Sequence, residues 1–202
     1  MRNKKRKIYG VGVNDYEGVV RSQGETMYEY VVWSDMIRRC YSVKERSRLP
    51  TYAGCQAEPC FHYFTNFLNF IKTLKGYKTK DEFGRRFHLD KDLLFKGNKL
   101  YSRNTVCLLP PEVNAFLTKS TSTRGKCMIG VSYHKRVHKF TAQFSYDGKL
   151  VHLGCYDSEK EAHLAYKTAK ENRAKELAEK WKHTIDERAY EALMSYTVYT
   201  SD

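Results

Sequence analysis

Residues 124–181 constrain the fold of this chain most, because three β-rich segments are followed by one long amphipathic helix. Alternating apolar and polar residues predict strands at 127–133, 139–146 and 151–156. Asp147-Gly148 is a two-residue hairpin signal between the last two strands. The helix is expected to begin at Asp157 or Ser158. The stretch therefore predicts a three-stranded antiparallel sheet packed on one helix.

Positive charge is concentrated in the same part of the chain. Between residues 119 and 153 there are seven Lys or Arg residues and one acid, Asp147, in a chain whose formal net charge is +13. Solvated surfaces usually mix both signs, so this imbalance favours a polyanionic partner over an ordinary solvated sheet face, which is the alternative. The candidate phosphate contacts are Arg124, Lys126, Lys135, Arg136, Lys139 and Lys149.

The predicted strand 139–146 presents two different faces, because alternate side chains of a strand point to opposite sides. Phe140, Ala142, Phe144 and Tyr146 form one set, and Lys139, Thr141, Gln143 and Ser145 form the other. The apolar set can pack on the helix, which leaves the polar set for phosphates and base edges in a DNA major groove. Gln143 and Ser145 are the candidate base-reading residues.

The order of short motifs in this region is also informative. The motifs are Arg124-Gly125-Lys126, Ile129-Gly130-Val131, Gly148-Lys149 and the segments 152–156 and 161–166. Together they resemble the plant ethylene-response-factor (APETALA-type) DNA-binding domain, in the version found in phage homing endonucleases. The resemblance implies a three-stranded sheet that lies in the major groove of double-stranded DNA and is backed by the helix.

Upstream, residues 86–118 predict a second kind of unit. Before this unit, helical spacing predicts helices at 28–41 and 61–71. Within it, the sequence predicts a strand at 87–94, a turn at 96–99, a strand at 106–109 and a helix opened by Pro110-Pro111. This order, with the pair Asp90-Lys91, resembles a degenerate HNH motif, the ββα-metal (His-Me finger) unit. The resemblance implies metal-dependent hydrolysis of DNA phosphodiester bonds.

The resemblance also assigns residues to roles. Asp90 matches the family's aspartate, Lys91 stands where the catalytic histidine would be, and Asn114 is the helix residue. Thr105 falls on the central asparagine, so Asn98 or Asn104 is the candidate replacement. The segments 89–92, 96–99 and 101–102 resemble a variant that recurs in phage homing-endonuclease-like proteins.

The chemistry of a nuclease requires a divalent metal and a group that activates water. Asp90, Asp92 and Asn114 are the candidate ligands for Mg²⁺ or Mn²⁺. Asp90 and Asp92 point to opposite faces of a regular strand, so they can share an ion only if the strand breaks there. Lysine with an ordinary pKa of about 10.4 is protonated at neutral pH. Lys91 would therefore stabilise charge, and His88 is the candidate substitute base.

Three other interpretations remain open. In the first, the finger keeps its fold but has no nuclease activity. The protein is then a non-catalytic DNA-binding regulator, and its surface carries a charge cluster of Asp90, Lys91 and Asp92. RNA binding ranks last, because the sequence lacks the paired aromatic stacking motif of common RNA-binding sheets. A candidate zinc site consists of Cys55, Cys60 and His62 with Cys40 or Cys107. Buried free cysteines are favoured, because the sequence lacks the two pairs of closely spaced cysteines that zinc fingers usually have.

The chain as a whole is expected to be an α+β protein of two domains. The first, 1–118, contains the N-terminal helices and the finger at about 86–118, and the second, 119–202, contains the APETALA-type domain and C-terminal helices. No apolar run approaches the roughly 18 residues of a membrane span, and no secretion signal is visible. We therefore expect a cytoplasmic protein, phage-encoded in a bacterial host by the resemblance, with a monomer favoured.

Overall fold

The computed structural model describes residues 7–118, 126–146 and 148–200 of the 202-residue chain. The predicted α+β class is confirmed, since helices and strands are mixed along the chain. Contacts divide the chain into two compact units. Unit 1 contains the described residues up to Leu109 with Thr184–Asp186, and unit 2 contains the described residues of Pro110–His183 with those after Asp186. Arg124 and Asp147, both singled out from the sequence, lie outside the described residues.

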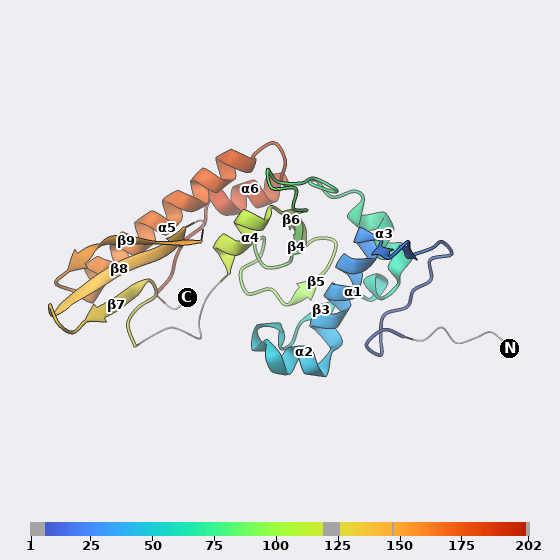
Figure 1. Ribbon diagram of the computed structural model, residues 1–202, viewed down its shortest axis with the longest axis horizontal. Coiled ribbons are helices and arrows are strands. Elements are labelled where there is room, and N and C mark those ends of the chain that lie inside the picture. Colours follow the sequence, from blue (N-terminus) through green and yellow to red (C-terminus); the bar gives the residue numbers. More distant parts are fainter. Residues whose placement is uncertain (1–6, 119–125, 147, 201–202) are drawn as a thin grey trace. The chain divides into compact units, whose positions relative to one another are not determined.

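The helices of unit 1, labelled in Figure 1, bury an aromatic core. They are α1 (Tyr28–Tyr41), α2 (Val43–Arg48) and α3 (Phe64–Ile71), with 3-10 turns at Pro50–Tyr52 and Pro59–His62. The prediction of a helix at 28–41 is confirmed, whereas the helix predicted at 61–71 begins three residues later because Pro59 opens a separate turn. Trp33 is fully buried against Phe64 and donates a 2.7 Å hydrogen bond from Nε1 to the carbonyl of Phe61.

The strands of unit 1 are short and form three separate pairs. β1 (Arg21–Ser22) pairs antiparallel with β2 (Glu25–Thr26), β3 (Gln56–Ala57) pairs parallel with β5 (Leu100–Tyr101), and β4 (His88–Asp90) pairs antiparallel with β6 (Cys107–Leu109). The strand predicted at 87–94 was too long. It ends at Asp90, because the Asp90 carboxylate accepts the backbone N–H groups of Asp92 and Leu93 and turns the chain.

Unit 2 contains the predicted three-stranded antiparallel sheet. Its strands are β7 (Val131–His134), β8 (Lys139–Tyr146) and β9 (Lys149–Tyr156), in the spatial order β7-β8-β9. The first strand begins later than predicted, because Gly130 adopts a positive φ of 77° just before it. A side chain at Gly130 would also meet the ring of Tyr166 at 2.1 Å, so this position requires glycine for close approach to the helix as well.

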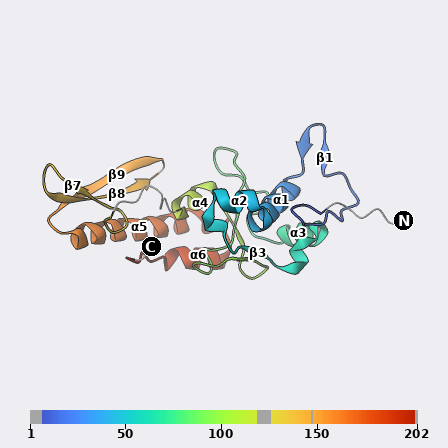
Figure 2. The same ribbon diagram turned by 90° about the horizontal axis from the view of Figure 1, so that it is seen from below.

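The helices of unit 2 are α4 (Pro111–Leu117), α5 (Glu159–Trp181) and α6 (Glu187–Met194). Ser158 caps α5 in a capping box with Glu161, which confirms the predicted start of this helix. Figure 2 shows α5 between the three strands and α6. Ala142 and Ala162 are fully buried, and such small side chains let a helix and a sheet pack closely. None of the described helices has the length and apolarity needed to cross a membrane.

Candidate functional site

The face of the sheet that α5 does not cover is polar, and we call it the open face. Cross-strand register places on one side of the sheet the residues Ser132, His134, Lys139, Thr141, Gln143, Ser145, Leu150, His152 and Cys155. Ala142, on the opposite side, is fully buried, whereas Ser145 is exposed. The predicted alternation along β8 is therefore confirmed, with Gln143 and Ser145 both on the open face.

The centre of the open face carries short polar groups that interact only loosely with one another. Thr141 Oγ1 lies 3.6 Å from Cys155 Sγ, and Cys155 Sγ lies 3.9 Å from His152 Nε2. The register shifts between Ala142 and Gln143, so that Gln143 faces His152 directly across the sheet. Such a bulge increases the local twist and re-aims the side chains beside it.

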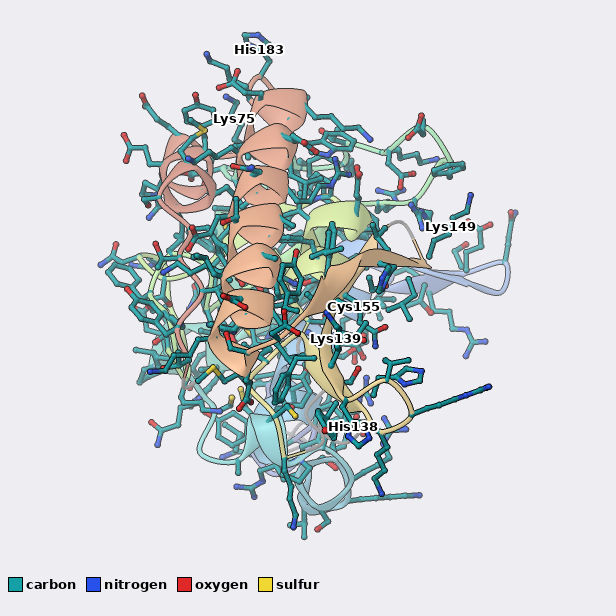
Figure 3. All side chains as sticks on the ribbon, turned by 90° about the vertical axis from the view of Figure 1, so that its left-hand side faces the viewer. Lys75, His138, Lys139, Lys149, Cys155 and His183 are labelled. Atoms are coloured by element: carbon teal, nitrogen blue, oxygen red, sulfur yellow. The ribbon has the colours of Figure 1, made fainter. Side chains whose placement is uncertain are left out.

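Basic residues lie at both ends of the sheet. Lys135 and Arg136 are exposed in the turn between β7 and β8, and Lys149 is exposed at the start of β9. Figure 3 shows His138 and Lys149 near opposite ends of the strands, with Lys139 and Cys155 between them. Lys139 Nζ lies 3.0 Å from Asp157 Oδ1. Within the described part of the chain, no acid forms an ion pair with Lys135 or Arg136, so these charges face solvent.

Some residues of this face were missed by the sequence prediction. Ser132, His152 and Cys155 join Gln143 and Ser145 only because β7 and β9 flank β8 in a defined register. A signal was present, because the hairpin at Gly148 fixes which residues of β9 lie opposite β8. The bulge shifts this register by one residue at Leu153, which alternation counted from the hairpin does not reveal.

Unit 1 carries a second cluster at the end of β4, in a segment that we call the carboxylate loop (residues 90–99). The strand break needed for Asp90 and Asp92 to converge is present, because β4 ends at Asp90. Asp92 then lies close enough for its charge to act on Asp90. Burial, and then the neighbouring charge of Asp92, raise the pKa of Asp90 to about 6.

The ammonium group of Lys91 is buried and lies beside the Asp92 carboxylate. Its Nζ is 3.1 Å from Asp92 Oδ2 and 5.8 Å from the centre of the Tyr101 ring. The side chain of Lys91 is only 7% exposed, whereas that of Asp92 is 51% exposed. Lys91 therefore neutralises part of the negative charge that the two aspartates bring together.

Asn98 fixes the shape of the carboxylate loop. Its Nδ2 donates to the carbonyls of Lys91 at 2.6 Å and Leu100 at 2.7 Å, and its Oδ1 accepts the N–H of Leu100 at 3.1 Å. Thr105 Oγ1 donates to the carbonyl of Leu100 at 2.6 Å. The geometry gives Asn98 a positioning role in the loop.

Asn114 lies on α4 in unit 2, whereas Asp90 and Asp92 belong to unit 1. Its backbone N–H donates to the carbonyl of Pro110 at 3.0 Å, and its carbonyl accepts the hydroxyl of Thr118 at 3.0 Å. These are ordinary contacts of a helix terminus. The role of Asn114 as a ligand beside the two aspartates stays a prediction.

His88 shares a face of β4 with Asp90, because Phe87 and Leu89 point into the core. Although His88 remains accessible to solvent, partial burial of its ring lowers its pKa, and the nearby charges of Arg39 and Arg85 lower it further. The charge of Arg39 also acts on Tyr101. Arg39 could not be assigned to this site from the sequence, because α1 precedes β4 by more than forty residues.

The cysteines of the candidate zinc site lie mostly in the core. Cys40, Cys55 and Cys107 are buried, and burial raises the pKa of Cys40 to about 12. His62 Nε2 is engaged at 2.9 Å by the hydroxyl of Tyr41. In the residues that the structure describes, no three or more His, Cys, Asp or Glu side chains converge as a metal ion would require.

Comparison of the chain with protein-family models, with curated proteins and with solved structures finds no match.

Proposed function

We propose that this protein binds double-stranded DNA through the open face of β7, β8 and β9. The observation that carries the proposal is the contrast between the two sides of the sheet. One side is covered by α5, and the other presents mostly short polar side chains, with exposed basic residues in the adjoining turn between β7 and β8. A two- or three-stranded ribbon of this kind fits a DNA major groove, where polar side chains reach base edges and lysines reach phosphates.

The side chains of the open face favour duplex DNA over single strands. Proteins that bind single-stranded nucleic acid stack bases on aromatic rings. The open face, as far as it is described, contains no Phe, Tyr or Trp, whereas Gln143 can form the paired hydrogen bonds that read adenine. Thr141, Ser145 and His152 add further donors and acceptors. These groups support sequence-selective binding.

Selection of binding sites from a randomised duplex library tests this proposal. Purified protein is expected to enrich a short motif and to bind it with an affinity that falls steeply as salt rises. Lys175→Gln, which removes an exposed charge from α5, is the matched control for charge changes on the open face. Failure to enrich any motif, together with equal affinity for single strands, would contradict the proposal.

The convergence of Asp90 and Asp92 favours a second function, metal-dependent cleavage of the bound DNA. The element order β4, β5, β6, α4 and the strand break at Asp90 support an HNH-like finger. Magnesium is commonly held by one or two carboxylates, with water and substrate phosphates completing the shell. Asp90 and Asp92 fit that pattern, and Asn114 is the proposed third ligand. Bound there, a divalent ion would stabilise negative charge on the phosphate.

The remaining groups of this site have roles that follow from their positions. His88, on the same face of β4 as Asp90, is the proposed base that takes a proton from water. Lys91 holds Asp92 and stabilises charge. Asn98 keeps the carboxylate loop in shape. The six cysteines are free, which suits the bacterial cytoplasm in which a phage-encoded nuclease would act.

Supercoiled plasmid incubated with Mg²⁺, Mn²⁺ or chelator tests cleavage. The native protein is expected to nick the plasmid only with metal, and Asp92→Ala and Asn114→Ala are expected to lose this activity. Asp35→Ala, which removes a carboxylate from α1, is the control and is expected to keep it. Mn²⁺ binding followed by electron paramagnetic resonance gives a readout that does not depend on activity. Tight duplex binding without nicking or Mn²⁺ binding would identify a non-catalytic regulator.

A further inference from the structure

Phe95 is an exposed aromatic residue at the tip of the carboxylate loop. Its side chain is 56% exposed, although the core of unit 1 buries several other phenylalanines completely. Leu93 and Leu94, just before it, are half-buried. The loop therefore presents one aromatic ring to solvent, next to the half-buried side chains of Leu93 and Leu94.

The loop that carries Phe95 is held at both ends. At its start, Asp90 Oδ1 accepts the N–H groups of Asp92 at 3.0 Å and Leu93 at 2.8 Å. At its end, the N–H of Asn98 donates to the carbonyl of Phe95 at 2.9 Å, and Gly97 supplies the positive φ of 78° that the turn requires. The ring is thus presented by an ordered backbone, and little conformational entropy remains to be lost when a partner binds it.

The surroundings of the ring indicate the chemistry of that partner. Lys96 and Lys99 are exposed on the same turn, and the Nζ of Lys99 donates to the carbonyl of Thr51 at 2.6 Å, which leaves its positive charge in place. Asp92 lies three residues before Phe95. An apolar tip with a cationic rim complements a partner that has an apolar interior and an anionic exterior, and a base-paired duplex has both.

We propose that Phe95 is a wedge that inserts between two stacked base pairs of double-stranded DNA. Apolar wedges of this type enter from the minor groove and kink the duplex, while flanking lysines contact the phosphates. The kink opens the backbone beside Asp90 and Asp92, where the proposed cleavage takes place. This inference rests on the proposed function, because it requires the protein to bind duplex DNA.

A second exposed phenylalanine provides a matched control. Phe83 is 72% exposed in the turn before β4, and the guanidinium group of Arg85 lies 5.0 Å from the centre of its ring. Both rings are therefore exposed in unit 1, but Phe83 is outside the carboxylate loop and is covered on one side by a cation. Phe83→Ala removes an exposed phenylalanine ring from unit 1 without touching the proposed wedge.

The experiment uses the full-length protein and a duplex obtained by site selection. The duplex carries 2-aminopurine at successive positions, to report unstacking, and a donor and acceptor dye at its ends, to report bending. Native protein is expected to raise 2-aminopurine fluorescence at one step and to increase energy transfer. Phe95→Ala is expected to lose both signals and to bind about tenfold more weakly, the scale of one lost base–aromatic stack. Phe95→Trp and Phe83→Ala keep both signals.

Each alternative result has a distinct meaning. If native protein fails to bind any duplex, the proposed function is wrong and the wedge fails with it. If native protein binds but Phe95→Ala gives the same fluorescence, bending and affinity, only the wedge is wrong. Loss of binding to phosphatidylserine vesicles in Phe95→Ala, with unchanged DNA signals, would also overturn the proposal and identify a lipid surface. Equal thermal unfolding of native protein and Phe95→Ala shows that the fold is intact.

Discussion

The open face of unit 2 and the carboxylate loop of unit 1 both gather charged and polar side chains, but the loop satisfies more of them by internal contacts. Lys135 of the turn beside the open face has no ion-pair partner among the described residues. In the loop, Asp90 accepts two backbone N–H groups, Lys91 pairs with Asp92, and Asn98 makes three hydrogen bonds with the backbone. The open face can therefore bind an external partner with little rearrangement. The loop must first break contacts such as the Lys91–Asp92 ion pair before its carboxylates can bind a metal.

This difference ranks the two proposed activities. Binding of DNA by the open face needs only the separation of Lys139 from the exposed Asp157, and a surface ion pair of this kind contributes little. Cleavage requires Asp92 to accept a metal while Lys91 is 3.1 Å away. The proposed binding activity therefore needs fewer rearrangements than the proposed nuclease activity, and the following variants test that contrast.

The largest effect is expected from Gly130→Ala. The new methyl group would meet the ring of Tyr166 at 2.1 Å and would also occupy a positive φ, so the free energy of unfolding of unit 2 should fall by about 3 kcal/mol or more. Gly148→Ala is the control, because its φ is also positive but a methyl group there meets nothing within 4 Å. Its expected cost is about 1 kcal/mol. Urea denaturation of both variants checks the difference, and equal costs would contradict close packing of Tyr166 on Gly130.

Gln143→Ala is expected to change specificity more than overall affinity. If Gln143 reads one base pair, its loss should remove about 2 kcal/mol of discrimination at that position and leave preferences elsewhere intact. Repeating the site selection with the variant measures this change. Thr168→Ala, an exposed substitution on α5, is the control. A uniform loss of affinity at all positions would assign Gln143 to the backbone instead.

The double variant Lys135→Gln/Arg136→Gln is expected to weaken binding to all duplexes to a similar extent. Removal of two phosphate contacts should lower affinity roughly tenfold, about 1.4 kcal/mol, and reduce the salt dependence by about two counterions. Fluorescence anisotropy over a salt series gives both quantities. An unchanged salt slope would show that the turn between β7 and β8 lies away from the DNA.

Asp90→Asn is expected to change stability by an amount that depends on pH. The raised pKa of about 6, against an ordinary 3.8, means that folded protein holds this proton more tightly than unfolded protein. Native stability therefore falls as pH rises between these values. Asparagine keeps the Oδ1 acceptor without the charge, so the variant should gain roughly 2 kcal/mol relative to native protein between pH 4 and pH 7. Urea denaturation at both pH values measures it, and a pH-independent difference would contradict the account.

The sequence was sufficient for elements whose patterns are local. The helix at α1 follows from the spacing of its apolar residues, and the three strands follow from alternation and from the hairpin at Gly148. The length of β4 could not be predicted, because a carboxylate that caps its own turn competes with the strand at Asp90.

The sites depended more on long-range structure. Lys139, Gln143 and Ser145 could be placed on one face because they alternate along a single strand. Arg39 could not be placed beside His88, since α1 and β4 meet only through the fold of unit 1. The pairing of Lys91 with Asp92 is local, but its burial depends on packing around Tyr101 that no local pattern records.

Protection of the Cys155 thiol is the most direct test of the central claim, because this exposed side chain lies in the middle of the open face. Alkylation is followed by peptide mass spectrometry, with and without saturating duplex DNA at low salt. A second thiol introduced by Lys175→Cys on α5 serves as the internal control. The account predicts that DNA slows alkylation of Cys155 several-fold and leaves the thiol on α5 unaffected. Equal rates at Cys155 with and without bound DNA would contradict it.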